Sequence, residues 1–132
     1  MTNSNAKGKR AERQLSRELR RYGLEARRGQ QHAGGPESPD VVHNLPRVHF
    51  EVKWNEKLDI GTALLIQAVA QAARDAPPGH LPVVAWKHRN KQWRVSFLLN
   101  IGLVEGETSL VIVTTTLHEF MLSQGYKLQE AA

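Results

Sequence analysis

The chain of 132 residues contains no cysteine, only two methionines and few aromatic residues. The absence of cysteine excludes disulfide bonds, a cysteine-ligated zinc site and a thiol nucleophile. No apolar run is long enough to cross a bilayer, and no N-terminal segment has the pattern of a secretory signal. We therefore expect a soluble cytoplasmic protein without a membrane partner, located in the host cytoplasm if the chain is viral.

The length and the apolar content set the scale of the fold. A chain of 132 residues with 40% hydrophobic residues can bury a core of its own. No repeat or linker divides the sequence. We expect a single domain over residues 1–132, with a flexible polar start at residues 1–6.

Positive charge is concentrated in the first 28 residues. The whole chain carries a net charge of +5, whereas residues 1–28 hold nine Lys and Arg against three Glu, a net +6. A concentrated cationic face is typical of a protein that binds a polyanion, although a solvated helix face gives the same composition. An anionic membrane is disfavoured because the first helix lacks a wide apolar face.

Apolar periodicity predicts a mixed α/β fold. Ala11, Leu15, Leu19 and Tyr22 recur at helical spacing, which leaves Glu12 at the edge of a buried stripe. Helices are predicted at residues 7–22, 58–75 and 117–122. Strands are predicted at 24–28, 40–43, 48–54, 81–87, 93–99 and 110–115, with 101–104 as an extension of the fifth. This order favours a mixed central sheet flanked by helices.

The strand at residues 48–54 carries the main chemical signal. Its apolar residues alternate with polar ones, as in a half-buried strand, so Glu51 and Lys53 share a face that we expect to be open. Asp40 begins the preceding strand. A short turn at Pro46 allows these two strands to pair as a hairpin, which brings Asp40 close to Glu51.

Two carboxylates held together repel each other unless a cation lies between them. Their hard oxygen ligands suit Mg²⁺, for which Mn²⁺ can substitute. Such an ion polarises a phosphate oxygen and acidifies water, while Lys53 orients the attacking water or neutralises charge in the transition state. Glu12 completes the site as a ligand or through a water molecule. Each signal is weak alone, but their joint order indicates a metal-dependent DNA endonuclease with catalytic residues Glu12, Asp40, Glu51 and Lys53.

These residues resemble the motifs of the PD-(D/E)xK nuclease superfamily and, more narrowly, those of archaeal-type and phage Holliday junction resolvases. The resemblance covers about residues 7–98 and rests on the segments Gly8–Arg13, Arg28–Gly35, Ser38–Val42, Phe50–Lys53 and Pro82–Ala85. It implies a restriction-endonuclease-like core, a divalent metal, and a homodimer that cuts paired strands of a four-way DNA junction. It also implies the roles given above for Glu12, Asp40, Glu51 and Lys53.

One residue differs from the motif of the archaeal resolvases. Ala33 stands where archaeal members often place a functional serine before a Gly-Gly pair, and Ser38 is a candidate substitute at a different spacing. The resemblance and the small size of the chain favour a phage origin over a cellular one.

Further polar residues are candidates for contact with DNA. Arginine and glutamine suit phosphate contact, and the glycines of the turn-rich segment 29–39 allow a close backbone approach. The predicted DNA-binding residues are Lys7, Lys9, Arg10, Arg13, Arg27, Arg28, Gln30, Gln31 and His32. Gln67 and Gln71 lie one helical turn apart, and they either face the site and touch water or phosphate, or are ordinary exposed polar residues.

Two questions stay open in the sequence. The apolar segments 95–104 and 110–113 belong either to one core or to a dimer interface, and the need for two symmetric cuts favours a homodimer. The function is that of a junction-resolving endonuclease, of another repair or restriction-like nuclease with this motif, or of a catalytically silent DNA-binding module. None of these uses a nucleotide cofactor.

Overall fold

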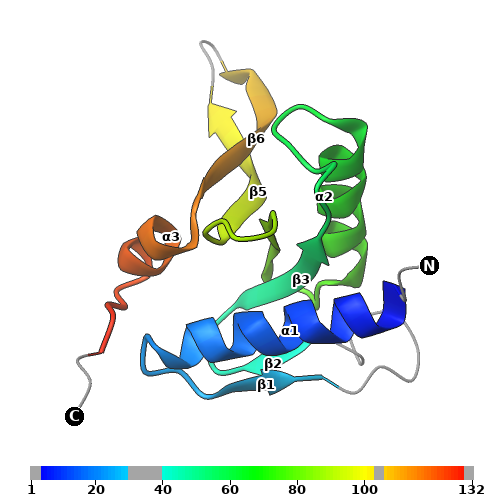
Figure 1. The fold of residues 1–132 in the computed structure, drawn as a ribbon. Coiled ribbons are helices and arrows are strands. Elements are labelled where there is room, and N and C mark those ends of the chain that lie inside the picture. The colour runs from blue at the N-terminus through cyan, green and yellow to red at the C-terminus, as the bar shows by residue number, and fades with distance from the viewer. Residues whose placement is uncertain (1–3, 30–39, 103–105, 130–132) are drawn as a thin grey trace.

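The computed structural model describes residues 4–29, 40–102 and 106–129. In this part of the chain, three helices surround two sheets (Figure 1). The elements are α1 (Ser4–Arg20), β1 (Ala26–Arg28), β2 (Val41–His43), β3 (Val48–Trp54), α2 (Ala63–Asp75), β4 (Leu81–Lys87), β5 (Arg94–Gly102), β6 (Thr108–Thr116) and α3 (Leu117–Ser123). The mixed α/β class predicted from the sequence is confirmed.

The larger sheet has the strand order β3-β4-β5-β6. β3 and β4 run parallel, with Glu51 opposite Val84 and Lys53 opposite Trp86, whereas β4, β5 and β6 are successively antiparallel. β1 and β2 form a separate antiparallel pair. The hairpin predicted between residues 40–43 and 48–54 is therefore wrong, because the second strand pairs with the first.

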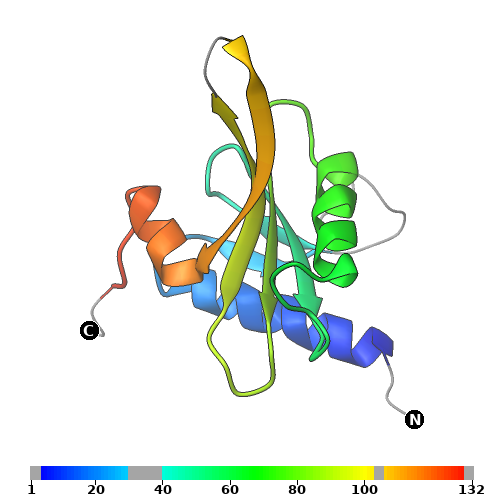
Figure 2. The ribbon, with the colours of Figure 1, turned by 90° about the horizontal axis from the view of Figure 1, so that it is seen from above.

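The part of the larger sheet around β3 and β4 is covered on both faces (Figure 2). Phe50 and Val52 of β3 belong to a core cluster that includes Leu15 and Leu19 of α1. Val84 and Trp86 of β4 point the other way and pack with α2, in a cluster with Leu65, Ala68, Val69 and Ala72. The predicted half-buried strand is thus wrong, because α2 covers the face of β3 that carries Glu51.

Two helix starts also differ from the prediction. α1 already begins at Ser4, three residues before the predicted start at residue 7. α2 begins at Ala63 and not at residue 58, because Thr62 caps it and accepts a hydrogen bond from the backbone N–H of Leu65. Gly23 follows α1 with φ +83°, a conformation that favours glycine and ends the helix as predicted.

β5 and β6 continue beyond the rest of the larger sheet. They pair from Arg94 opposite Thr116 to Gly102 opposite Thr108, whereas the pairing of β4 with β5 ends at Ser96. The outer half of this hairpin therefore projects from the body of the molecule (Figures 1 and 2). No helix in the described part of the chain is long and apolar enough to cross a membrane.

Candidate active site

Asp40 is fixed to the free edge of β3. Its Oδ2 atom accepts a hydrogen bond of 2.8 Å from the backbone N–H of Val52. Successive N–H groups of a strand point to alternate edges, and β4 occupies only one edge of β3. This bond brings Asp40 next to Glu51 without the predicted hairpin, so the expected proximity is reached by a different route.

Asp40 and Glu51 form a buried pair of carboxyl groups. Their exposed fractions are 9% and 5%, and the two groups share a hydrogen bond. Burial and the charge of Asp40 raise the pKa of Glu51 to about 8. Burial also raises the pKa of Asp40, against the hydrogen bond from Val52. Such a pair favours a bound cation, so these residues fit a hard divalent metal.

Lys53 lies at the solvent side of this pair. Its Nζ atom is 3.6 Å from Oε1 of Glu51, and its side chain is 36% exposed while that of Glu51 is 7% exposed. The two side chains share a face of β3, as their spacing predicted. Lys53 is therefore the more solvent-accessible partner of Glu51.

Glu12 reaches the same region from α1. It is 8% exposed, as its position at the edge of the apolar stripe predicted, and its Oε2 accepts a hydrogen bond of 2.8 Å from Nε of Arg28. Burial and the charge of Asp40 raise the pKa of Glu12, and the bond from Arg28 lowers it. Within residues 4–29, 40–102 and 106–129, no three carboxylate or imidazole groups are arranged to hold one metal ion. Asp40 and Glu51 are the two carboxyl groups that share a hydrogen bond there.

The predicted DNA-binding residues divide into two sets. In the first set, Lys9, Arg10, Arg13 and Arg27 are exposed, the Nζ atom of Lys7 lies 5.9 Å from the centre of the Trp54 ring, and Arg28 bonds to Glu12. The second set, Gln30, Gln31 and His32, lies outside the described residues, as do Ala33 and Ser38.

Gln67 and Gln71 line a pocket together with Lys53. The same pocket includes Arg74, which the sequence interpretation missed. The signal was present, because Gln67, Gln71 and Arg74 follow one another at spacings of four and three and so share one face of α2.

A buried acidic pair at the edge of a mixed α/β sheet, with Lys53 two residues beyond Glu51, defines a nuclease of the restriction-endonuclease-like class. Comparisons with known proteins give the family. The model of the archaeal Holliday junction resolvase family (Hjc) matches residues 3–129, and the chain belongs to this family. It is therefore a metal-dependent endonuclease that resolves DNA junctions.

A solved structure agrees with this assignment. The Holliday junction resolvase Hjc of the archaeal hyperthermophile Archaeoglobus fulgidus is 26% identical in sequence and has a TM-score of 0.52. The match covers 94% of this chain and 99% of that chain. No curated protein sequence matches the chain significantly. A phage origin remains a prediction.

Proposed function

We propose that this chain hydrolyses phosphodiester bonds of four-way DNA junctions in paired nicks, with Mg²⁺ held by Asp40 and Glu51. The observation that carries the metal assignment is the buried carboxyl pair, in which burial and the charge of Asp40 raise the pKa of Glu51 to about 8. We propose further that residues 1–132 act as one domain and that the protein works in the cytoplasm, because its substrate is DNA.

The residues of the site have distinct proposed roles. Asp40 and Glu51 would hold the ion, which would act as a Lewis acid on the scissile phosphate. Lys53, 3.6 Å from Glu51, orients the attacking water and neutralises charge that develops on the phosphate. Glu12 acts through a water molecule, and Arg28 keeps its carboxylate in place from 2.8 Å.

The exposed basic residues of α1 supply the proposed docking surface for DNA. Lys9, Arg10 and Arg13 are exposed, and Lys9 lies one helical turn before Glu12, so a phosphate that it binds lies on the side of α1 that carries Glu12. Contacts of this kind orient DNA without reading its bases. The shape of the junction and the spacing of two active sites then determine where it is cut.

Cleavage of matched substrates tests this function. With Mg²⁺, we expect two symmetric nicks in a synthetic four-way junction and no cutting of a linear duplex of the same sequence. With a chelator, we expect binding of the junction without cutting. Equal cutting of junction and linear duplex would favour a repair or restriction-like nuclease, and binding without cutting in both Mg²⁺ and Mn²⁺ would favour a silent binding module.

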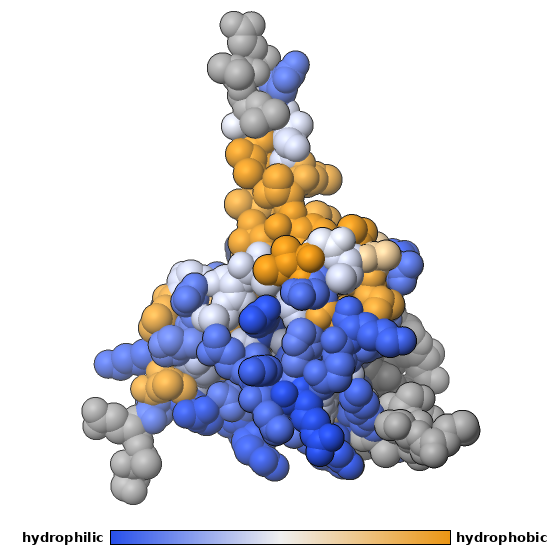
Figure 3. Space-filling model, turned by 45° about the horizontal axis from the view of Figure 1, so that its top comes forward, coloured by the Kyte–Doolittle hydropathy of each residue, from blue (hydrophilic) through white to orange (hydrophobic). Residues whose placement is uncertain are grey.

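The projecting β5–β6 hairpin supports a homodimer. Each face of its projecting half exposes apolar side chains: Leu99 and Ile101, 46% and 40% exposed, lie on one face, and Leu110 and Ile112, 66% and 36% exposed, lie on the other. We call the face that carries Leu110 and Ile112 the hairpin surface. Figure 3 shows that hydrophobic side chains gather on the projection, above a mainly hydrophilic body. β6 is also an edge strand of the larger sheet. Exposed apolar edges of this kind associate, and a second copy supplies the second active site for paired nicks.

Charge on the hairpin surface should break the dimer. For the double variant Leu110→Lys and Ile112→Lys, we expect a dimer dissociation constant at least a hundredfold higher, because lysine at a buried apolar interface loses its hydration. Sedimentation measures the constant, and a cruciform plasmid reports the nicks. The double variant should give single nicks, whereas Leu122→Lys on α3 should behave as the wild type. A double variant that stays dimeric would show that the copies meet elsewhere.

A further inference from the structure

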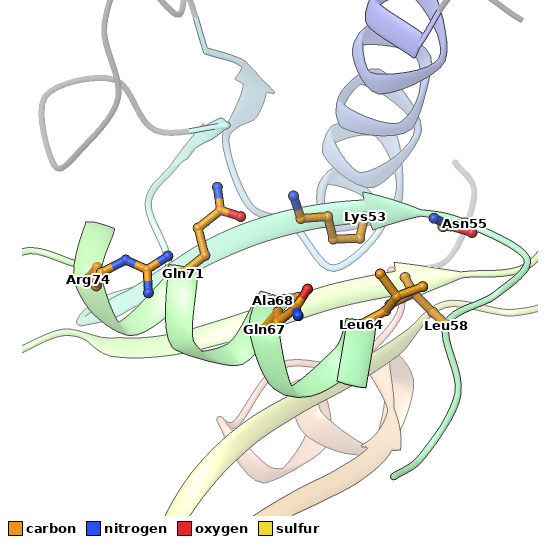
Figure 4. A pocket seen from close by; sticks show the side chains of 8 residues that line it. All are labelled: Lys53, Asn55, Leu58, Leu64, Gln67, Ala68, Gln71 and Arg74. Carbon is orange, nitrogen blue, oxygen red and sulfur yellow. The ribbon is translucent and has the colours of Figure 1, made fainter. Parts of the chain in front are cut away.

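A groove between β3 and α2 adjoins the candidate active site. It has a volume of about 430 Å³, within the range of ligand pockets. We call it the β3–α2 groove, lined by Lys53, Asn55, Leu58, Leu64, Gln67, Ala68, Gln71 and Arg74. Lys53 and Gln71 extend from the strand and the helix toward the same side of the groove (Figure 4). Lys53 lines the groove and also belongs to the candidate active site. A ligand in the groove therefore lies directly beside the reacting phosphate.

The charge of the β3–α2 groove favours an anion. Lys53 and Arg74 are its cations, and none of its described lining residues is acidic. The exposed guanidinium of Arg74 makes no ion pair with any described residue. A guanidinium without such a partner is well suited to a phosphate group, to which it can donate two hydrogen bonds.

The remaining lining residues favour a ligand that is larger than a phosphate group alone. Leu58 and Ala68 form an apolar floor with exposed fractions of 3% and 4%, and Leu64 is 39% exposed at the mouth. Gln67 and Gln71 carry amides, which both donate and accept hydrogen bonds, as the edge of a nucleobase requires. A nucleotide joins a phosphate to a flat base and therefore matches both parts of this lining.

We propose that the β3–α2 groove holds one nucleotide of the cleaved strand, next to the scissile phosphate. Arg74 contacts the phosphate of this nucleotide. Gln67 and Gln71 hydrogen bond to the edge of its base, which packs on the apolar floor. This inference rests on the proposed function and names the part of the junction that the site takes up. It also makes Arg74 a substrate-binding residue.

The contact of Arg74 is tested by removing phosphate charges one at a time. Junctions carrying a single methylphosphonate at successive positions around the cut are bound in chelator, and affinity is read by fluorescence anisotropy. We expect one position beside the cut to weaken wild-type binding on the order of tenfold. Arg74→Ala should bind the unmodified junction about as weakly as wild type binds the junction modified at that position. A methylphosphonate at that position should not weaken the binding of Arg74→Ala further. Lys91→Ala, which removes an exposed charge from the turn between β4 and β5, should keep both properties.

The base contact is tested with abasic sites in the same junction. One abasic position beside the cut should slow wild-type cleavage in Mg²⁺ and leave the cleavage rate of the double variant Gln67→Ala and Gln71→Ala unchanged. The inference is overturned if Arg74→Ala behaves as Lys91→Ala does, or if every abasic position affects wild type and double variant equally. Failure of the wild-type protein to cut the unmodified junction would instead overturn the proposed function.

Discussion

Replacement of Glu51 by Gln is expected to lower the rate of junction cleavage on the order of a thousandfold while junction affinity in chelator stays within about twofold. Glutamine keeps the shape of the side chain but removes the charge that Glu51 contributes to the proposed metal site. Binding should survive because the exposed basic residues of α1 are unchanged. Single-turnover cleavage with Mg²⁺ and anisotropy with chelator measure the two quantities.

Glu25→Gln is the matched control for this variant. Glu25 is an exposed carboxylate between α1 and β1, outside the acidic pair. We expect it to cut at the wild-type rate. If Glu51→Gln also cut at the wild-type rate, the assignment of Asp40 and Glu51 as metal ligands would be wrong. Loss of binding together with cleavage would mean that the pair maintains the fold of the docking surface.

The same substitution should stabilise the metal-free protein at alkaline pH. Burial and the charge of Asp40 raise the pKa of Glu51 to about 8 in the folded protein, above its ordinary value of 4.5. Between these values the folded protein holds a proton that the unfolded chain releases, so the contribution of Glu51 to stability is lost as the pH rises. At pH 8 in chelator, we expect Glu51→Gln to be more stable than wild type by on the order of 3 kcal/mol, or about 10 °C in Tm.

Thermal unfolding over a range of pH measures this difference. The gain should vanish well below pH 4.5, where both the folded and the unfolded wild-type protein keep the proton of Glu51. His43 has a pKa of about 4 because it is buried, and its own pH dependence is common to both proteins and cancels in the comparison. Added Mg²⁺ should stabilise wild type at pH 8 and leave Glu51→Gln unchanged. A difference that stayed constant with pH would contradict the raised pKa of Glu51.

The sequence by itself determined the local structure and the kinds of side chain that form the site. Strand β3 has the bounds that the alternation of apolar and polar residues at 48–54 predicted, and β4 has those predicted from the apolar run at 81–87. Each strand is bounded by polar or turn residues. The shared face of Glu51 and Lys53 followed from the period of a strand, and the buried edge position of Glu12 followed from the period of a helix. Each of these features depends on residues close together in the chain.

Only the tertiary structure decided how these segments meet. The partner of β2 is β1 and not β3, and Asp40 reaches Glu51 through the backbone of Val52. The burial of Glu51, and hence its raised pKa, comes from α2, whose position on the sheet no local pattern determines. The β3–α2 groove likewise exists because α2 lies across from Lys53. Pairings between distant segments depend on packing over the whole sheet, whereas periodicity reports one segment at a time.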